Sequence, residues 1–284
     1  MTQQGPTSNP LFDDLKTRSV VAVIFGCVAF FFVWLGSIGF SAFMGAITAL
    51  MLVEFARLVK EESRLENLPR LAIVICGALS VFLLEFSGVW FTAIASLGLL
   101  IAATFNRKAL GKVTVIGYAI IVIGAASAVH IRGVAAGFPI IIWIVLCVAA
   151  ADIGGYMFGR LLQGPKLLPR ISPKKTWSGF LGGIGLSAIV AIIFSFFSGG
   201  GFLNLLLFGI VIAVVSVAGD LLESSVKRKF GVKDAGTLLP GHGGLLDRLD
   251  GMTLVMVFFG ALSFLTNLGE RLSPDYAAMI GNAL

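Results

Sequence analysis

The chain has 284 residues, of which 57% are hydrophobic and only 13% are charged, and its formal net charge is +6. A soluble domain normally carries about 25% charged residues, so this composition excludes an ordinary soluble globular protein. The apolar runs are long and continuous rather than alternating, which favours membrane-spanning helices over a β-barrel. We therefore expect an all-α, polytopic transmembrane helix bundle. Three cysteines, Cys27, Cys76 and Cys147, lie inside apolar runs and are typical of small core side chains rather than disulfide partners.

The first 18 residues are polar, and the apolar run after them lacks an A-x-A-like cleavage site, which indicates a retained first helix rather than a signal peptide. About 20 apolar residues cross the hydrocarbon core as a helix. The sequence predicts about nine spans, at roughly 20–35, 39–58, 70–86, 89–105, 113–130, 137–158, 178–197, 203–222 and 252–268. The first four spans form an N-terminal transmembrane region, residues 1–112. The remainder forms a C-terminal region, residues 113–284, with two polar loops at 159–177 and 223–251.

The distribution of positive charge supports this count. With the N-terminus in the cytoplasm, nine spans leave only Arg132 and Arg271, of 21 Lys and Arg, on the opposite side. Cytoplasmic loops of membrane proteins carry such an excess of Lys and Arg. We therefore expect a cytoplasmic N-terminus and a C-terminus on the opposite side. The modest net charge is interpreted as a topology signal, and no nucleic-acid partner is expected.

The first polar motif is "DIGGYMFGR", at the end of the expected sixth span. If the helix continues, Asp152, Tyr156 and Arg160 share one face. A carboxylate near bilayer depth is costly and usually faces a cavity or a charged partner. The motif is therefore either one wall of a site or a charge pair that holds two helices together.

The second motif is "RISPKKTWSG", just before the expected seventh span. Cations and hydroxyls at a helix N-terminus suit phosphate oxygens. The same residues would also serve as a basic segment that binds anionic headgroups, with the Trp as an interfacial anchor. The candidate phosphate ligands here are Ser172, Lys174, Lys175, Thr176 and Trp177.

The third motif begins with "GDLLESSVKRKFGVKDAG" at the end of the eighth span. On a continuing helix, Asp220, Ser224, Lys227 and Arg228 share one face. Lys233 and Asp234 follow, as further candidates for the site.

The motif ends with "PGHGGLLDRLDG". If this part is helical, Asp247 and Asp250 are i, i+3 neighbours and repel each other. A shared divalent cation would relieve the repulsion, and Mg²⁺ suits such oxygen ligands best, whereas there is no Cys/His cluster for zinc. Glycines next to His242 allow the backbone to approach a ligand closely. His242 would bind a phosphate, shuttle a proton or serve a structural role. Together, carboxylates, cations and glycines suit a metal-bound polyphosphate at a membrane surface.

The run from Ser224 to Gly251 resembles the signature of phosphatidate cytidylyltransferases, also called CDP-diacylglycerol synthases. "DIGGYMFGR" and "SPKKTWSG" resemble two further blocks of that family, in the expected order. The family usually has an acidic residue where this chain has Ser178. The resemblance covers the C-terminal half well, whereas the first hundred residues match only as generic hydrophobic helices. The signature residues are Ser225, Lys227, Arg228, Lys233, Asp234, Pro240, His242, Gly243, Gly244, Asp247, Arg248 and Asp250.

The resemblance implies that the chain joins CTP and phosphatidic acid to give CDP-diacylglycerol and pyrophosphate, in phospholipid biosynthesis, with region 113–284 catalytic. It assigns Asp220 and Asp247 to Mg²⁺, with Asp250 as a third carboxylate. The cations Lys227, Arg228, Lys233 and Arg248 would hold the triphosphate and the lipid phosphate. A second cation, divalent or K⁺, and a homodimer are both compatible with it. We expect an integral protein of a bacterial inner membrane, with its site facing the cytoplasm.

Two other functions remain open on sequence grounds. A transporter would also bury charges in a helix bundle, but here they cluster at one membrane face, without an inverted repeat of broken helices. A CTP-dependent polyprenol or dolichol kinase would transfer the γ-phosphate to an alcohol and release CDP instead of pyrophosphate. The absence of the D-G-x-x-A-R block argues against a CDP-alcohol phosphotransferase.

Overall fold

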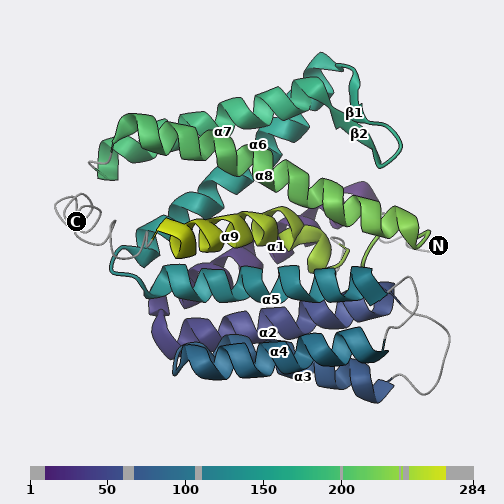
Figure 1. Cartoon of the computed structure of the whole chain (residues 1–284). Helices are drawn as coiled ribbons and strands as arrows, with labels where there is room; N and C mark the ends of the chain where they lie inside the picture. Colours follow the sequence, from purple (N-terminus) through teal and green to yellow (C-terminus); the bar gives the residue numbers. More distant parts are fainter. Residues whose placement is uncertain are drawn as a thin grey trace, which may run out of the picture.

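The computed structural model describes residues 10–59, 67–105, 111–198, 201–236, 238 and 243–266. These described ranges contain nine α-helices and one two-stranded hairpin, and each expected span coincides with a helix (Figure 1). The predicted all-helical class is confirmed. The elements are α1 (Pro10–Leu35), α2 (Ser37–Leu58), α3 (Asn67–Leu83), α4 (Gly88–Phe105), α5 (Gly111–Gly133), α6 (Gly137–Leu162), β1 (Lys166–Leu168), β2 (Ser172–Thr176), α7 (Trp177–Ser198), α8 (Phe202–Lys229) and α9 (Leu246–Thr266).

Five of these helices, α2, α5, α6, α7 and α8, are long and apolar enough to cross a membrane, and two shorter apolar helices cover Val20–Leu35 and Arg70–Leu83. The number nine for the spans therefore stays a prediction. The two ends of the chain, residues 1–9 and 267–284, lie outside the described residues. The predicted cytoplasmic N-terminus and the C-terminus on the opposite side of the membrane therefore stay predictions.

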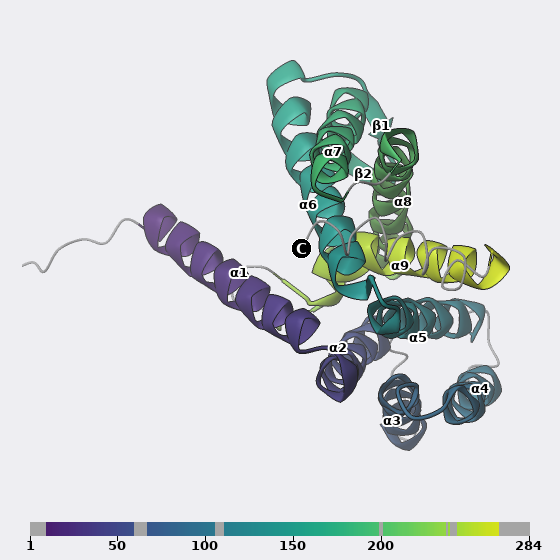
Figure 2. The same cartoon turned by 90° about the vertical axis from the view of Figure 1, so that its left-hand side faces the viewer.

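The helices form layers on either side of α9. Figure 2 shows α6, α7 and α8 on one side, α5 and α2 on the other with α3 and α4 beyond them, and α1 slanting away from the rest. Buried apolar side chains come mainly from α2, α5, α6 and α9, among them Leu52, Val122, Ile144 and Val255. Apolar side chains elsewhere, on α1 and α7 for example, are widely exposed, as expected for surfaces that face lipid.

The glycines of the first two motifs bring α6 and α7 into backbone contact. A Cβ on Gly154 would lie 2.6 Å from the Gly182 carbonyl oxygen, and one on Gly179 would lie 2.6 Å from the Gly155 oxygen. Small residues that let helices approach this closely are a common basis of packing in membranes. The contact fixes the ends of α6 and α7, which carry the candidate site.

The hairpin of β1 and β2 was not expected. Its strands are antiparallel, and the Ile171 N–H donates to the Leu168 carbonyl across the turn at 3.1 Å. Pro169 occupies the second turn position, where its fixed φ is favourable. Within the predicted loop 159–177, the residues after α6 therefore form a short hairpin that holds Lys175 beside α8.

Candidate active site

The three polar motifs meet at one end of the bundle. The C-terminal ends of α6 and α8, the β1–β2 hairpin and the start of α9 lie on the same side, at the right in Figure 1. The expected helical continuations are confirmed, because α6 extends to Leu162, α8 extends to Lys229 and α9 begins at Leu246. The third motif is separated from the first two by α7 and most of α8, and the fold brings it beside them.

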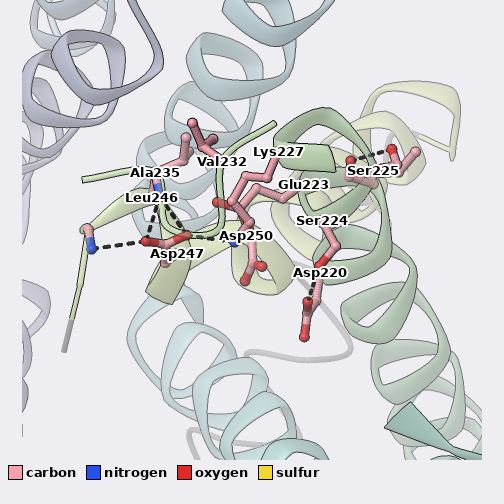
Figure 3. Close-up of polar contacts among 12 residues, drawn as sticks. Asp220, Glu223, Ser224, Ser225, Lys227, Val232, Ala235, Leu246, Asp247 and Asp250 are labelled. Carbon is pink, nitrogen blue, oxygen red and sulfur yellow. Dashed lines mark hydrogen bonds and ion pairs between the residues drawn. The ribbon is translucent and has the colours of Figure 1, made fainter. Parts of the chain in front are cut away.

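A buried ion-pair cluster, defined as Glu223, Lys227 and Asp247, joins α8 to α9 (Figure 3). The Lys227 ammonium lies 2.6 Å from a Glu223 oxygen and 2.6 Å from Asp247 Oδ1. The exposed fraction of the side chain is only 11% for Lys227, 9% for Glu223 and 10% for Asp247. Sequence analysis assigned Lys227 to phosphate, but in this arrangement its ammonium contacts two carboxylates. The contacts with Glu223 and Asp247 link α8 to α9, and the phosphate role of Lys227 stays a prediction.

Asp247 also binds the backbone at both described ends of the glycine-rich stretch, residues 235–236 and 243–244. Its carboxylate accepts hydrogen bonds from the Ala235 N–H, at 3.1 and 3.0 Å to the two oxygens, and from the Gly244 N–H at 3.0 Å. Burial alone would raise the pKa of Asp247, but the hydrogen bonds from Lys227 and Gly244 outweigh it and hold that pKa below its ordinary value. Asp247 therefore stays ionised as a fixed anchor.

A second contact, the open ion pair of Lys175 and Asp220, joins the hairpin to α8. The Lys175 ammonium lies 2.6 Å from Asp220 Oδ2, and the side chains are 24% and 40% exposed. The Ser224 hydroxyl donates to Asp220 Oδ1 at 3.3 Å. Because partly exposed ion pairs contribute little net stability, this pair is easily opened by a ligand, unlike the buried ion-pair cluster.

Further carboxylates crowd around Asp220. Asp152 on α6 lies within electrostatic range of Asp220, Lys175 and Arg248. Asp250 lies at the start of α9, ahead of its apolar stretch, and accepts the Gly251 N–H at 2.7 Å. Burial and the neighbouring Asp220 raise the pKa of Asp250 well above its ordinary value. Repulsion between carboxylates therefore centres on Asp220, whereas the repulsion expected between Asp247 and Asp250 stays a prediction.

These carboxylates match the donor chemistry of Mg²⁺. Within the described ranges, no three His, Cys, Asp or Glu side chains are arranged as a complete set of metal ligands. Mg²⁺ in nucleotide enzymes usually needs only one or two carboxylates, because substrate phosphates and water complete its shell. Asp220 and the crowded Asp250 fit that requirement. Asp247 would become a further metal ligand only if the ion replaced its contact with the Lys227 ammonium.

On α6, the Arg160 guanidinium donates to the Tyr156 hydroxyl at 2.8 Å, and both side chains are exposed. The predicted face with Asp152 is therefore present, with the three side chains following one another along one helix. Arg228 donates to the carbonyls of Ile171 and Val232, at 3.3 and 3.4 Å, and so ties the hairpin turn to the end of α8.

The remaining predicted site residues are mostly exposed where the structure describes them. Trp177 is 46% exposed and packs edge-on against Phe180. His242 and Pro240 lie outside the described residues. Ser172 is partly buried. Exposed side chains belong to Lys174, Lys233, Asp234 and Arg248.

Thr176 serves as a helix cap. Its side chain is 5% exposed, and its hydroxyl oxygen accepts the Gly179 N–H at 3.1 Å and the Ser178 hydroxyl at 3.1 Å. This is the bonding pattern of a Thr that precedes a helix and caps its third residue. Ser178, where the resemblance expected an acid, also accepts the Gly164 N–H at 3.1 Å. Both hydroxyls therefore fix the junction of hairpin and α7.

We expect Thr176→Val to destabilise the protein by about 1–2 kcal/mol, because it removes the cap and leaves a buried N–H unpaired. Thr176→Ser, which keeps the acceptor, is the control. The check is the thermal midpoint in detergent. An unchanged midpoint with a raised KM for the nucleotide would contradict the cap and support direct phosphate binding.

Sequence reasoning missed two acidic residues at the site. Glu223 is three residues after Asp220 and four before Lys227, a spacing that places it on their helix face. Glu54 is the only acidic residue in the expected span 39–58, and it is buried on α2. A lone carboxylate in an apolar span was a usable signal.

A cavity of about 240 Å³ reaches the site from the bundle. Its walls are mostly apolar, from α2, α5, α8 and α9, and Glu223 and Asp250 lie among its lining residues. The site thus combines an apolar chamber with a charged edge.

Comparison with known proteins identifies the family of the chain. Residues 16–266 match the model of the cytidylyltransferase family. The chain is 34% identical to the phosphatidate cytidylyltransferase of Brucella suis biovar 1 (strain 1330) over 263 residues, which is 88% of this chain and 94% of the relative. It is also 34% identical to that of Bacillus subtilis (strain 168) over 262 residues, 86% of this chain and 96% of the relative. The Helicobacter pylori (strain J99) protein of the same name is 47% identical over 128 residues, 45% of this chain and 46% of the relative. The chain belongs to the cytidylyltransferase family.

Proposed function

We propose that the chain is a Mg²⁺-dependent phosphatidate cytidylyltransferase of phospholipid biosynthesis. A phosphate oxygen of phosphatidic acid attacks the α-phosphorus of CTP, the bond to the β-phosphate breaks, and CDP-diacylglycerol and pyrophosphate form. The names of the relatives support this reaction. The observation that carries it is the open ion pair of Lys175 and Asp220 beside crowded carboxylates, at the charged end of a bundle of apolar helices.

The proposed reaction requires neutralisation of the negative charge on its two substrates rather than a strong general base. The lipid phosphate is already ionised near neutral pH, so the obstacle is the approach of two polyanions. Lys175, released from Asp220, would bind a phosphate of CTP, and Arg248 would be a second cation for it. Asp220 and Asp250 would hold Mg²⁺, which when bound offsets charge on the phosphates and the departing pyrophosphate. The buried ion-pair cluster would keep the glycine segment and α9 fixed during this exchange.

The apolar cavity suits the lipid substrate. Its walls come from residues such as Phe55, Val113 and Leu222, and Asp250 lies at its polar edge. The start of an acyl chain would lie against these walls while the headgroup meets CTP at the membrane surface. The apolar helices support placing the whole chain in the membrane.

We further propose nine spans, a cytoplasmic N-terminus, a C-terminus on the opposite side and a cytoplasmic site in a bacterial inner membrane. The described ends of α6 and α8 carry Arg160, Lys227, Arg228 and Lys229 at the same end of the bundle, which supports this orientation under the positive-inside rule. A second cation and a homodimer stay predictions.

The test uses the full chain purified in detergent, with CTP, Mg²⁺ and phosphatidic acid, and measures pyrophosphate and lipid-linked cytidine. Equal amounts of both, dependent on the lipid and abolished by EDTA, are expected. Release of CDP with phosphorylation of a lipid alcohol would replace the proposal with the kinase. Absence of CTP turnover in a folded sample, with substrate movement only across a sealed membrane, would replace it with a transporter.

A further inference from the structure

Glu54, on α2 in the N-terminal half, is a buried carboxylate that the proposed reaction does not use. Its side chain is only 1% exposed. Burying a carboxylate in an apolar helix is costly, so its position requires partners that compensate for the lost water. Those partners belong to the site.

The first partner is the start of α9. Glu54 Oε2 accepts a hydrogen bond from the Leu246 N–H at 2.8 Å, across 192 positions of sequence. The first N–H groups of a helix have no partner within the helix, and the N-terminus carries a partial positive charge. A carboxylate at this point therefore holds the beginning of α9. The next residue along the chain is Asp247.

The Glu54 carboxylate also lies beside two glycines. A Cβ on Gly236 would lie 2.5 Å from Glu54 Oε1, and one on Gly244 would lie 2.7 Å from Oε2. Gly236 is not among the positive-φ glycines of the described residues, so its backbone conformation would accept a side chain. The Glu54 carboxylate, rather than backbone strain, is what requires a glycine there. Oε1 has no hydrogen-bond partner in the described part of the chain.

The two described ends of the glycine-rich stretch, residues 235–236 and 243–244, are thus held from two sides. Asp247 accepts the N–H groups of Ala235 and Gly244, while the Glu54 carboxylate fills the space that a Cβ on Gly236 or Gly244 would take. We propose that Glu54 is a positioning residue, which seats this segment and the first turn of α9 so that Asp247 meets Lys227. This proposal rests on the proposed function for its catalytic measurement, and it makes α2 of the N-terminal region a part of the active-site framework.

A double-mutant cycle tests the contact between Glu54 and Gly236. Gly236→Ala alone is expected to lower kcat about 100-fold, since displacements near 1 Å at a reacting site have effects of this size. In a Glu54→Ala background the same change should lower kcat less than about threefold, because the oxygen it collides with has gone. Gly185→Ala is the control, as no atom lies within 4 Å of a Cβ built there. Equal effects in both backgrounds, or a Gly236→Ala variant as active as the wild type, would overturn the proposal.

A second pair of variants separates positioning from folding. Glu54→Gln keeps an acceptor for Leu246 and should retain at least about a third of kcat, whereas Glu54→Leu should lose about 100-fold, with KM for CTP nearly unchanged. Activities are measured well below the thermal midpoint and per folded molecule. A Glu54→Leu variant with normal kcat under these conditions would show that Glu54 serves stability alone.

Hydrogen exchange gives a measurement that needs no activity. In Glu54→Leu, the peptide containing residues 243–250 should exchange at least about tenfold faster than in the wild type, and peptides from α7 should be unchanged. If the wild type does not turn over CTP and phosphatidic acid, the proposed function fails, while this exchange still decides the positioning role. Unchanged exchange in 243–250 would overturn it.

Discussion

Lys227→Met is expected to lower kcat/KM for CTP at least about 1,000-fold, which is the largest single effect we expect at this site. The ammonium is shared by Glu223 and Asp247, at 2.6 Å from each, and all three side chains are about nine-tenths buried. Breaking a buried ion pair by removing one partner costs about 3–5 kcal/mol, because the remaining charge has no compensation. Here two carboxylates would remain, and Asp247 would no longer hold the glycine segment. Lipid-dependent pyrophosphate release in detergent measures the effect.

Lys229→Met is the matched control, because Lys229 lies in the same last turn of α8 but is exposed. It should keep nearly normal activity. The double variant Lys227→Met with Glu223→Gln replaces both members of one buried contact with uncharged side chains, so its thermal midpoint should recover toward that of the wild type while activity stays low. Recovery of both the thermal midpoint and the activity would show that Lys227 contributes to folding alone. More than about a tenth of normal activity in Lys227→Met alone would contradict the role of the buried ion-pair cluster altogether.

Helical periodicity was enough to predict which side chains share a face. On α8, Asp220, Ser224 and Lys227 lie at i, i+4 and i+7, and the Ser224–Asp220 hydrogen bond confirms the continuation of the helix past the apolar stretch. The start of α9 likewise carries Asp247 and Asp250 one turn apart. These are local properties, fixed by 3.6 residues per turn and by the run of residues that favours a helix.

The pairing of cations with anions was not predictable in the same way. Lys227 carried a predicted phosphate role, yet it meets Asp247 twenty positions away, and Lys175 from the hairpin meets Asp220 on α8. Such contacts depend on how helices pack, and spacing along one helix does not encode that. Glu54 shows the limit most clearly, because its partner Leu246 lies in the other half of the chain. The lone acid in an apolar span indicated a partner without indicating which one.

Asp220→Asn is expected to lower kcat about 100-fold or more and to raise the Mg²⁺ concentration for half-maximal activity about tenfold. The reason is that other carboxylates crowd around Asp220 and that its ion pair with Lys175 is partly exposed and easily opened. An exposed pair of this kind contributes little to stability, so the thermal midpoint should hardly change. A Mg²⁺ titration of pyrophosphate release measures both quantities in one experiment. Glu85→Gln, in the turn between α3 and α4 at the other end of the bundle, is the control and should change neither.

Lys175→Met distinguishes a metal ligand from an ordinary salt-bridge partner. If Lys175 stays paired with Asp220 until the ion and nucleotide bind, its removal should lower the Mg²⁺ concentration needed for half-maximal activity. The same change should lower kcat, because a phosphate contact is lost. The two variants of one ion pair would then shift the Mg²⁺ requirement in opposite directions. A pair that only ties the hairpin to α8 would give the same shift, or none, in both variants. That result would remove Asp220 from the metal site and leave the ion to Asp250 and Asp247.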